Sequence, residues 1–255
     1  MQRKGLQKAP LAGAFLFVWL GLAAGLQAAG PRSVEVRHVI DGDSLELTNG
    51  QQVRLIGVNT PEMTGADDRP EPLAEKARAA LINLISQRPV RLIPGMEKRD
   101  RHRRLLAYVE TEDGRDVQER LLSEGLGFLV AIPPNIARLN RYQAAQENAR
   151  RSGRGVWGHS AFAPVLADNL EKNDAVRGFR QVRGTIQSLH SGSRDYYFKL
   201  SPGFQIKIPK SHWVYFQMQP GDMLNKPVVV RGWVTHGKYR LQMRVPHPAM
   251  LEFES

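Results

Sequence analysis

The dipeptide Asn49-Gly50, which stands between two β-rich runs, constrains the fold more than any other feature of the chain. Asn-Gly is the strongest short signal for a β-hairpin, because both residues tolerate the positive φ angles of a two-residue turn. With these two residues as the turn, Asp43 is predicted to pair with Ile56. Side chains alternate between the faces of a strand, so Asp43 and Arg54 are predicted to project from the same face.

The residues after this hairpin predict a mixed α+β domain. The apolar positions of Leu73–Ile85 recur at helical spacing and predict a helix. Val90–Ile93 and Leu105–Val109 have the composition of strands. Two more helices are predicted, from about Val117 to Gly125 and from Ile136 to Ser152, since a glycine follows the apolar pattern of each.

Residues 179–255 predict a second, all-β domain, and residues 161–178 predict a linker. Five short β-rich runs, separated by Gly-containing turns, fit a small closed barrel of the OB type. A generic five-stranded barrel or a small sandwich is the alternative. The predicted strands are Arg180–Leu189, Tyr196–Leu200, Gln205–Ile208, Val228–Val234 and Arg240–Val245.

Residues 1–28 have the three-part layout of a secretory signal peptide. Three cations, Arg3, Lys4 and Lys8, precede the uncharged apolar run Leu11–Leu26, and small residues follow it. This run is shorter than the roughly 20 residues that a membrane-spanning helix needs. We therefore expect cleavage near Ala28 and a periplasmic or secreted protein without a stable membrane anchor; a retained anchor is the alternative.

The charge balance predicts an acidic partner. The chain has 36 Lys and Arg against 25 Asp and Glu, which gives a net charge of +11. Such a basic chain favours nucleic acid or an anionic surface as partner. Cysteine is absent, which excludes thiol catalysis, zinc–thiolate sites and disulfides.

Two polar clusters in the first domain carry the residues suited to catalysis. The first joins Val39–Ser44 to Arg54–Glu62, and the second is Asp100–Tyr108. Carboxylate and amide oxygens suit a hard cation such as Ca²⁺, and arginine suits a phosphate. A carboxylate beside both can activate water. The clusters therefore make a phosphodiester hydrolase plausible, with solvated surface ion pairs as the alternative.

These two clusters, in this order, resemble those of the staphylococcal nuclease (thermonuclease) family over residues 33–158. The resemblance implies an α+β, OB-type five-stranded barrel with three helices. The OB-like barrel predicted for residues 179–255 from its short strands would then be the second barrel of the chain. It also implies a calcium-dependent nuclease that cuts DNA and RNA and leaves 3′-phosphates.

The resemblance assigns a role to each matching residue. Asp43, Asn59 and the backbone carbonyl of Thr60 would bind Ca²⁺, with Asp41 outside the coordination shell. Glu62 would act as general base on the attacking water. The scissile phosphate would be bound by Arg54 and Arg104.

Several positions depart from the family pattern. Asn59 stands where the family has aspartate, so the metal site loses one negative charge and weaker calcium binding or a different metal preference is expected. Arg103 replaces a glycine, and His102 replaces an aromatic residue. Tyrosines that flank the nucleotide base in the family fall at Ala131 and Pro133, so base stacking should differ.

A run of cations precedes the second arginine. The functional interpretation is a rim that follows the nucleic-acid backbone, and the alternative is a solvated loop. The residues assigned to this rim are Lys98, Arg99, Arg101 and Arg103.

Two rival functions stay open. One is a nucleic-acid-binding or scaffolding protein with little catalysis, which Asn59 favours. The other is an envelope protein whose C-terminal barrel binds a protein partner. The aromatic residues and cations of residues 179–255 predict an accessory module for substrate or partner binding.

Overall fold

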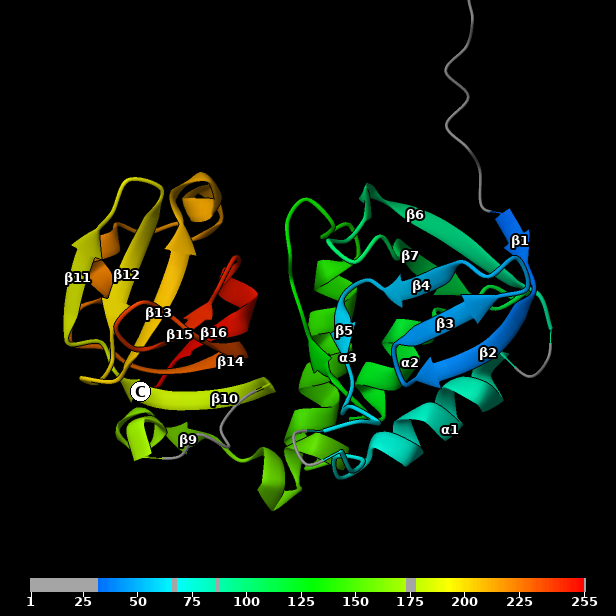
Figure 1. The fold of residues 1–255 in the computed structure, drawn as a ribbon, viewed down its shortest axis with the longest axis horizontal. Helices are drawn as coiled ribbons and strands as arrows, with labels where there is room; N and C mark the ends of the chain where they lie inside the picture. The colour runs from blue at the N-terminus through cyan, green and yellow to red at the C-terminus, as the bar shows by residue number, and fades with distance from the viewer. Residues whose placement is uncertain (1–31, 66–67, 86–87, 173–177, 255) are drawn as a thin grey trace, which may run out of the picture. The chain divides into compact units, whose positions relative to one another are not determined.

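The computed structural model describes residues 32–254, apart from 66–67, 86–87 and 173–177 (Figure 1). Pro31–Ser255 form one compact unit that contains two large β-sheets. The predicted signal peptide lies outside the described residues. Within the described ranges, no helix is long and apolar enough to cross a membrane.

The first sheet is a strongly curled, six-stranded sheet that belongs to the N-terminal part of the chain (Figure 1). Its order is β1-β6-β7-β4-β3-β2, antiparallel throughout except for the parallel pair β4 and β7. A separate two-stranded pair joins β5 to β8. The strands are β1 (Arg32–Val34), β2 (Val36–Asp41), β3 (Ser44–Leu47), β4 (Gln52–Leu55), β5 (Val58–Asn59), β6 (Val90–Arg99), β7 (Leu105–Glu110) and β8 (Phe128–Leu129).

The hairpin between β3 and β4 forms where the sequence predicts it, but its register differs by one residue. Ser44, not Leu45, lies opposite Arg54. The turn is longer than predicted because Leu47 N donates to Gln51 O, and Gly50 adopts a φ of 78°. This is a three-residue loop that ends in a left-handed glycine, rather than a two-residue turn. The predicted pairing of Asp43 with Ile56 is therefore wrong.

Three helices accompany the first sheet, and all three were expected. They are α1 (Ala74–Ile85), α2 (Val117–Ser123) and α3 (Leu139–Arg151). Helix α3 begins three residues later than predicted. Gly125 ends α2 with a φ of 66°, and an added Cβ there would lie 2.2 Å from the carbonyl oxygen of Arg154. Only glycine combines this conformation with this close approach.

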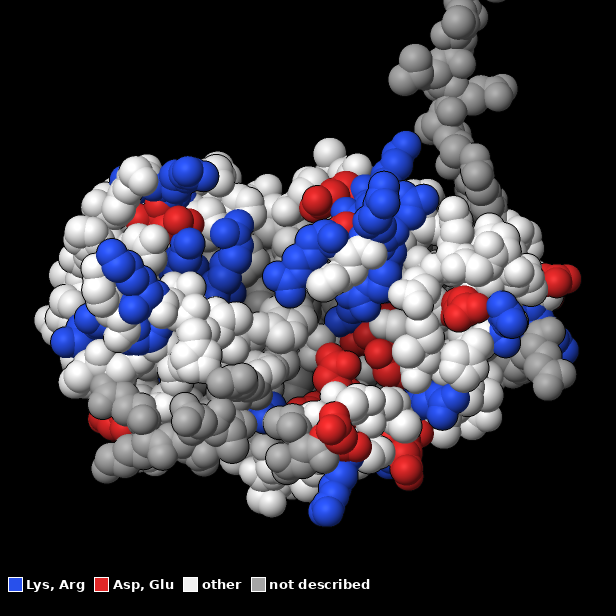
Figure 2. Space-filling view, viewed as in Figure 1, with Lys and Arg blue, Asp and Glu red and all other residues white. Residues whose placement is uncertain are grey.

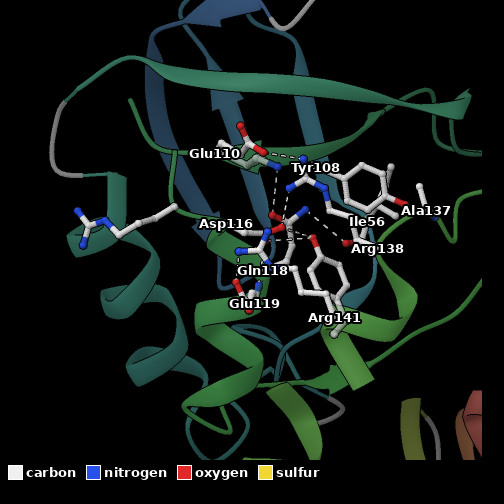
Figure 3. Close-up of polar contacts among 12 residues, drawn as sticks. Ile56, Tyr108, Glu110, Asp116, Gln118, Glu119, Ala137, Arg138 and Arg141 are labelled. Atoms are coloured by element: carbon white, nitrogen blue, oxygen red, sulfur yellow. Dashed lines mark hydrogen bonds and ion pairs between the residues drawn. The ribbon is translucent and has the colours of Figure 1, made fainter. Parts of the chain in front are cut away.

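A buried polar network joins β7 to α2 and α3 (Figure 3). Asp116 is the N-cap of α2 and accepts hydrogen bonds from Glu119 N, from Tyr142 Oη at 3.1 Å and from Arg138 Nη1 at 2.5 Å. Arg138 also pairs with Glu110 on β7 at 2.7 Å. The network holds Arg138, the N-cap residue of α3, and thereby the start of this helix.

The second sheet follows the order β11-β12-β13-β15-β14-β10-β9, with β16 added to β14. The predicted strand Arg180–Leu189 is divided into two strands with different partners: β10 pairs with β14, and β11 pairs with β12. The strands are β9 (Val165–Leu166), β10 (Gly178–Thr185), β11 (Ser188–Ser191), β12 (Asp195–Lys199), β13 (Phe204–Pro209), β14 (Pro227–His236), β15 (Leu241–Arg244) and β16 (Leu251–Phe253).

Six short 3₁₀ helices connect the strands within the described part of the chain: η1 (Gly155–Trp157), η2 (Ser160–Phe162), η3 (Ala167–Lys172), η4 (Lys210–Tyr215), η5 (Pro220–Met223) and η6 (Pro248–Met250). The described part of the predicted linker is packed rather than extended. Strand β9 pairs with β10, and Ala167 and Leu170 are buried in the core of the second sheet. The boundaries of the two domains stay a prediction.

The apolar residues form two buried clusters. One fills the first sheet and includes Leu45, Val53 and Leu81. The other contains the core of the second sheet together with Phe128 and Val156 of the N-terminal part. Phe128 stacks on Phe179 with ring centroids 5.3 Å apart. The C-terminal strands therefore share a continuous core with β8 and η1.

Candidate active site

The centre of the site is a buried ion pair between Asp43 and Arg54. Arg54 Nη1 lies 2.5 Å from Asp43 Oδ1, and the two side chains are 13% and 5% exposed. Asp43 precedes β3 within a turn, so strand alternation does not determine its direction. The two side chains meet, as the sequence predicts, although the predicted register that led to this expectation is wrong.

Arg54 also holds the segment that carries Asn59. Its Nη1 donates to the carbonyl oxygen of Val58 at 3.0 Å, and its Nη2 donates to Asn59 Oδ1 at 2.9 Å. Both residues belong to β5, which lies beyond the end of β4. The guanidinium of Arg54, which belongs to β4, therefore connects β5 to the carboxylate of Asp43.

The turn between β2 and β3 brings Asp41 and Thr60 next to Asp43. Asp41 Oδ1 accepts a hydrogen bond from Asp43 N at 3.0 Å, and Thr60 N donates to Asp43 Oδ2 at 2.8 Å. Gly42 lies between Asp41 and Asp43 in the sequence, and a Cβ added to Gly42 would lie 2.7 Å from Thr60 Oγ1. Glycine is therefore required for this close approach. The hydroxyl of Thr60 is buried without a hydrogen-bond partner within the described residues.

Glu62 comes two residues after Thr60 and lies at the edge of the site. Its side chain is exposed, and its carboxylate accepts no hydrogen bond from the part of the chain that the structure describes. Its backbone is held in place, because Glu62 N donates to Glu71 Oε2 at 3.0 Å and Glu62 O accepts from Glu71 N at 2.9 Å. The carboxylate is thus left free to accept a proton from water.

Arg104 is positioned by the turn between β6 and β7. Asp100 Oδ2 accepts hydrogen bonds from Arg104 Nε and lies 2.8 Å from Arg104 Nη2, while Asp100 Oδ1 accepts from Arg104 N. Arg103, at the position of the family's glycine, has a φ of 66°. The left-handed backbone that glycine favours is therefore kept here in a residue with a side chain.

Asp43, Glu62, Arg54 and Arg104 line one cavity of about 710 Å³, together with Asp41 and Asn59. Of the predicted rim, Arg101 also lines this cavity, whereas Lys98, Arg99 and Arg103 are exposed outside its lining. Thr60 is buried behind the lining and contacts Asp43. Figure 2 shows acidic side chains gathered in a hollow of the nuclease-like part, with a band of Lys and Arg beside them.

Burial and neighbouring charges raise the pKa values of the two carboxyls of the site that would act in hydrolysis. Burial and, to a smaller extent, the charge of Asp41 raise the pKa of Asp43 to about 7, against the opposing effect of Arg54. Glu62 reaches solvent at the edge of the site, but desolvation by the surrounding cavity walls and the charge of Asp41 raise the pKa of its carboxyl, while Arg54 and Arg104 lower it. A raised pKa makes Glu62 a better proton acceptor near neutral pH.

Comparison with known proteins gives the family. A family model described as "Staphylococcal nuclease homologue" matches residues 52–159. The chain is 31% identical over 139 residues to a thermonuclease of Staphylococcus hyicus, covering 81% of that protein and 53% of this chain. This chain belongs to the staphylococcal nuclease family. It is also 32% identical to a thermonuclease of Staphylococcus intermedius, over 74% of that protein and 48% of this chain.

The nuclease family match extends to longer relatives. Endonuclease YncB of Bacillus subtilis (strain 168) is 30% identical over 135 residues, which cover 64% of that protein and 51% of this chain. The matched family domain stops at residue 159, so the second sheet lies outside it.

The donors of this nuclease-family site fit a hard divalent cation. They are oxygen atoms only: the carboxylates of Asp43 and Asp41, the carbonyl of Thr60 and the amide of Asn59. Within the described residues no three His, Cys, Asp or Glu side chains are arranged to hold a metal by themselves. Backbone oxygens, amide oxygens and waters commonly complete the sites of such cations, so the donor set is chemically compatible with one. Burial, with a smaller contribution from the charge of Asp41, raises the pKa of Asp43, and a bound cation would oppose both effects.

Two residues that position this nuclease site were not assigned a role from the sequence. Asp100 holds Arg104 through two oxygens, and Glu71 holds the backbone of Glu62. Glu71 also lies 3.3 Å from Arg180 on β10. An acidic residue four positions before Arg104 was a usable signal for the first. Nothing local in the sequence pointed to Glu71, because its partners are 9 and 109 residues away.

Proposed function

We propose that this chain is an exported, calcium-dependent nuclease that hydrolyses phosphodiester bonds of DNA and/or RNA. The observation that carries the proposal is that Glu62, Arg54 and Arg104 line the same cavity as the oxygen donors around Asp43. A site that bound nucleic acid without cutting it would need the arginines but not the free carboxylate of Glu62. The thermonuclease and endonuclease names of the relatives agree with this activity.

The chemistry follows from the charges on these side chains. Glu62 accepts a proton from the attacking water, since its carboxylate is exposed and its pKa is raised. The guanidinium groups of Arg54 and Arg104 bind the phosphate oxygens and stabilise the charge that develops on them. The water oxygen bonds to phosphorus as the bond to the 5′ oxygen breaks, and the leaving 5′ oxygen takes up a proton from solvent. The phosphate then stays on the 3′ side, so cleavage gives a 3′-phosphate and a 5′-hydroxyl.

Asp43, Asn59 and the carbonyl oxygen of Thr60 are the proposed calcium ligands, with Asp41 beside them. A bound Ca²⁺ would polarise the phosphate and offset the negative charge of the carboxylates. Arg54 donates to both Asp43 and Asn59, so it holds the two donor side chains in fixed positions. The Arg54 guanidinium therefore serves both the phosphate and the donor set.

Export is proposed from residues 1–28 alone, which have the layout of a secretory signal peptide. The substrates would then be nucleic acids in the periplasm or outside the cell. Arg101, which lines the cavity, and the neighbouring Lys98, Arg99 and Arg103 are proposed to contact their phosphates.

A second candidate is a nucleic-acid-binding protein on the nuclease fold, with little catalysis. Asn59 favours it, because one charged donor of the family's metal site is replaced by a neutral amide. The retained Glu62 argues against it, because binding alone does not require a general base.

Hydrolysis of single-stranded DNA, duplex DNA and RNA by the protein without residues 1–28 tests the proposal. The expected result is cutting with Ca²⁺, loss of cutting with a chelator, and products that carry 3′-phosphates. Arg104→Ala is expected to abolish the activity, and Arg88→Ala, a cation outside the cavity, is its matched control. Salt-sensitive binding without cutting under any divalent cation would favour the second candidate.

A further inference from the structure

One face of the second sheet carries a row of aromatic and basic residues in direct cross-strand register. His190 pairs with Tyr197, Tyr197 with Lys207, and Lys207 with Arg244. On the adjoining strands Trp233 pairs with Phe179. The sequence neighbours of these residues point to the core of the sheet. Four such neighbours are buried: Phe198 next to Tyr197, Ile206 next to Lys207, Met243 next to Arg244 and Val234 next to Trp233. Strand alternation therefore places the row on the opposite face of the sheet, where Phe128 covers Phe179.

Part of this face lines the same cavity as the catalytic residues. The five residues it contributes come from β13, β14 and β15, and none of them is acidic; they are Lys207, Trp233, Thr235, Gln242 and Arg244. The remainder of the lining supplies the carboxylates, including Asp43 and Glu62. One cavity thus has a hydrolytic side and a basic, aromatic side.

Trp233 is the one Phe, Tyr or Trp side chain in this lining. It is half-buried, and its ring meets Phe179 edge-on, with centroids 5.1 Å apart and an interplanar angle of 86°. A ring held in this way loses little conformational freedom when a base stacks on it. In the nuclease domain, Ala131 and Pro133 occupy the positions of the family's base-flanking tyrosines. Both residues are buried and offer no aromatic surface.

The two cations of this face, Lys207 and Arg244, differ in the contacts that they make within the protein. Arg244 is exposed and makes no ion pair with any described residue. Lys207 Nζ lies 3.2 Å from Asp195 and 5.8 Å from the centre of the Tyr197 ring. Arg244 is therefore the freer of the two to bind a phosphate.

We propose that this face, centred on Trp233, Lys207 and Arg244, binds a single-stranded stretch of the nucleic acid adjacent to the scissile phosphate. Aromatic rings beside cations along a groove are how proteins bind single strands without base-specific contacts. Trp233 would stack on a base, and the two cations would contact the backbone phosphates. The inference deepens the proposed nuclease function and rests on it for the nature of the substrate.

The test measures binding without cleavage. The protein without residues 1–28 carries Glu62→Gln throughout and is titrated against a fluorescein-labelled single-stranded 15-mer by anisotropy, at several salt concentrations. Arg244→Ala and Lys207→Ala are each expected to weaken binding by roughly three- to tenfold and to reduce the salt slope by about 0.7. Trp233→Leu is expected to weaken it on the order of tenfold with an unchanged slope, because stacking is not ionic.

Lys226→Ala and Tyr239→Ala are the matched controls. Lys226 comes just before β14 and Tyr239 just after it, both side chains are exposed, and neither lines the cavity. Trp233→Leu removes a contact with Phe179, so its result counts only with an unfolding curve like that of the parent. The two cation variants do not depend on this packing. If both bind with the affinity and salt slope of the Lys226→Ala control, the proposed face is excluded.

This outcome is separable from failure of the nuclease proposal. A protein that cuts nucleic acid but shows no effect of the two cation variants keeps the activity and loses this binding face. A protein that cuts nothing, yet loses affinity in these variants, keeps the binding face and loses the activity.

Discussion

Arg54 bridges Asp43 and Asn59: its Nη1 lies 2.5 Å from Asp43 Oδ1, and its Nη2 donates to Asn59 Oδ1 at 2.9 Å. The replacement of the family's aspartate by Asn59 therefore keeps an oxygen in contact with the guanidinium and removes a negative charge. The amide also places a donor, Nδ2, 3.3 Å from the carbonyl oxygen of Thr60. This donor competes with a cation for the same oxygen.

Asn59→Asp is expected to strengthen calcium binding. The change adds a negative charge to the donor set and removes the hydrogen bond to Thr60 O, so the Ca²⁺ concentration for half-maximal cleavage should fall roughly tenfold. Asn49→Asp makes the same chemical change at the exposed hairpin turn and should leave that concentration as it is. Equal calcium requirements in Asn59→Asp and the parent would remove Asn59 from the proposed ligands.

Arg103→Gly is expected to stabilise the protein by roughly 0.5–1 kcal/mol. Relief of the left-handed backbone is worth about 1–2 kcal/mol, and the greater freedom of glycine in the unfolded chain costs about 0.5–1 kcal/mol. Arg101→Gly, two residues earlier in the same turn and without a positive φ, should instead destabilise by about 0.5–1 kcal/mol. Urea unfolding of the two variants measures this difference, and a loss of stability in both would contradict the account of the turn.

Asp116→Asn is expected to destabilise the nuclease domain by about 3–5 kcal/mol. The amide still caps α2 through Glu119 N, but it leaves the charge of the largely buried Arg138 without its nearest partner. The comparison is Glu119→Gln, which breaks the exposed pair with Arg141 and should cost no more than about 1 kcal/mol. Similar losses in the two variants, measured by urea unfolding, would show that the network in Figure 3 is not a buried charge cluster.

The C-terminal sheet is expected to lose stability in mild acid. Burial lowers the pKa of His247, and the charge of His212 lowers it further; burial and Arg244 lower the pKa of His212. Tyr215 packs beside both rings and Pro246 O lies 3.2 Å from His212 Nδ1. The unfolded chain therefore binds protons more readily than the folded protein, and stability falls as pH decreases below the ordinary histidine pKa of about 6.5.

The variant His247→Asn tests this effect, because its amide oxygen keeps the hydrogen bond that Ala249 N donates to His247 Nδ1. Its free energy of unfolding should decrease less between pH 7 and pH 5 than that of the parent. His190→Asn, at an exposed histidine of the same sheet, serves as the control and should follow the parent. An identical decrease in all three proteins would contradict the assignment.

Local patterns predict most of the secondary structure, and they fail where the chain leaves regular geometry. The helices α1, α2 and α3 follow from apolar spacing and terminal glycines. The register of the β3–β4 hairpin does not, because Asn49-Gly50 is compatible with both a two-residue and a three-residue loop. Since Asp43 lies in a turn, strand alternation cannot place it, and its contact with Arg54 was expected for the wrong reason.

The parts of the site that escape prediction depend on long-range contacts. Glu71 reaches Glu62 and Arg180, and Arg138 reaches Glu110 across 28 residues. The cavity also depends on residues far apart in the sequence, because Trp233 and Arg244 line it from strands that follow the family domain. Their composition predicts a binding module, but only the cross-strand register shows which side chains share a face.

The central claim is that Glu62 is the general base of a nuclease. Its most direct measurement is the rate of calcium-dependent cleavage of single-stranded DNA by Glu62→Gln, with Glu97→Gln, a carboxylate that also lines the cavity, as the comparison. Glu62→Gln should lower kcat by about 10²–10⁴-fold while the affinity for DNA stays close to that of the parent. A change of less than about threefold is expected in Glu97→Gln. Cleavage by Glu62→Gln at the rate of the parent would contradict the claim.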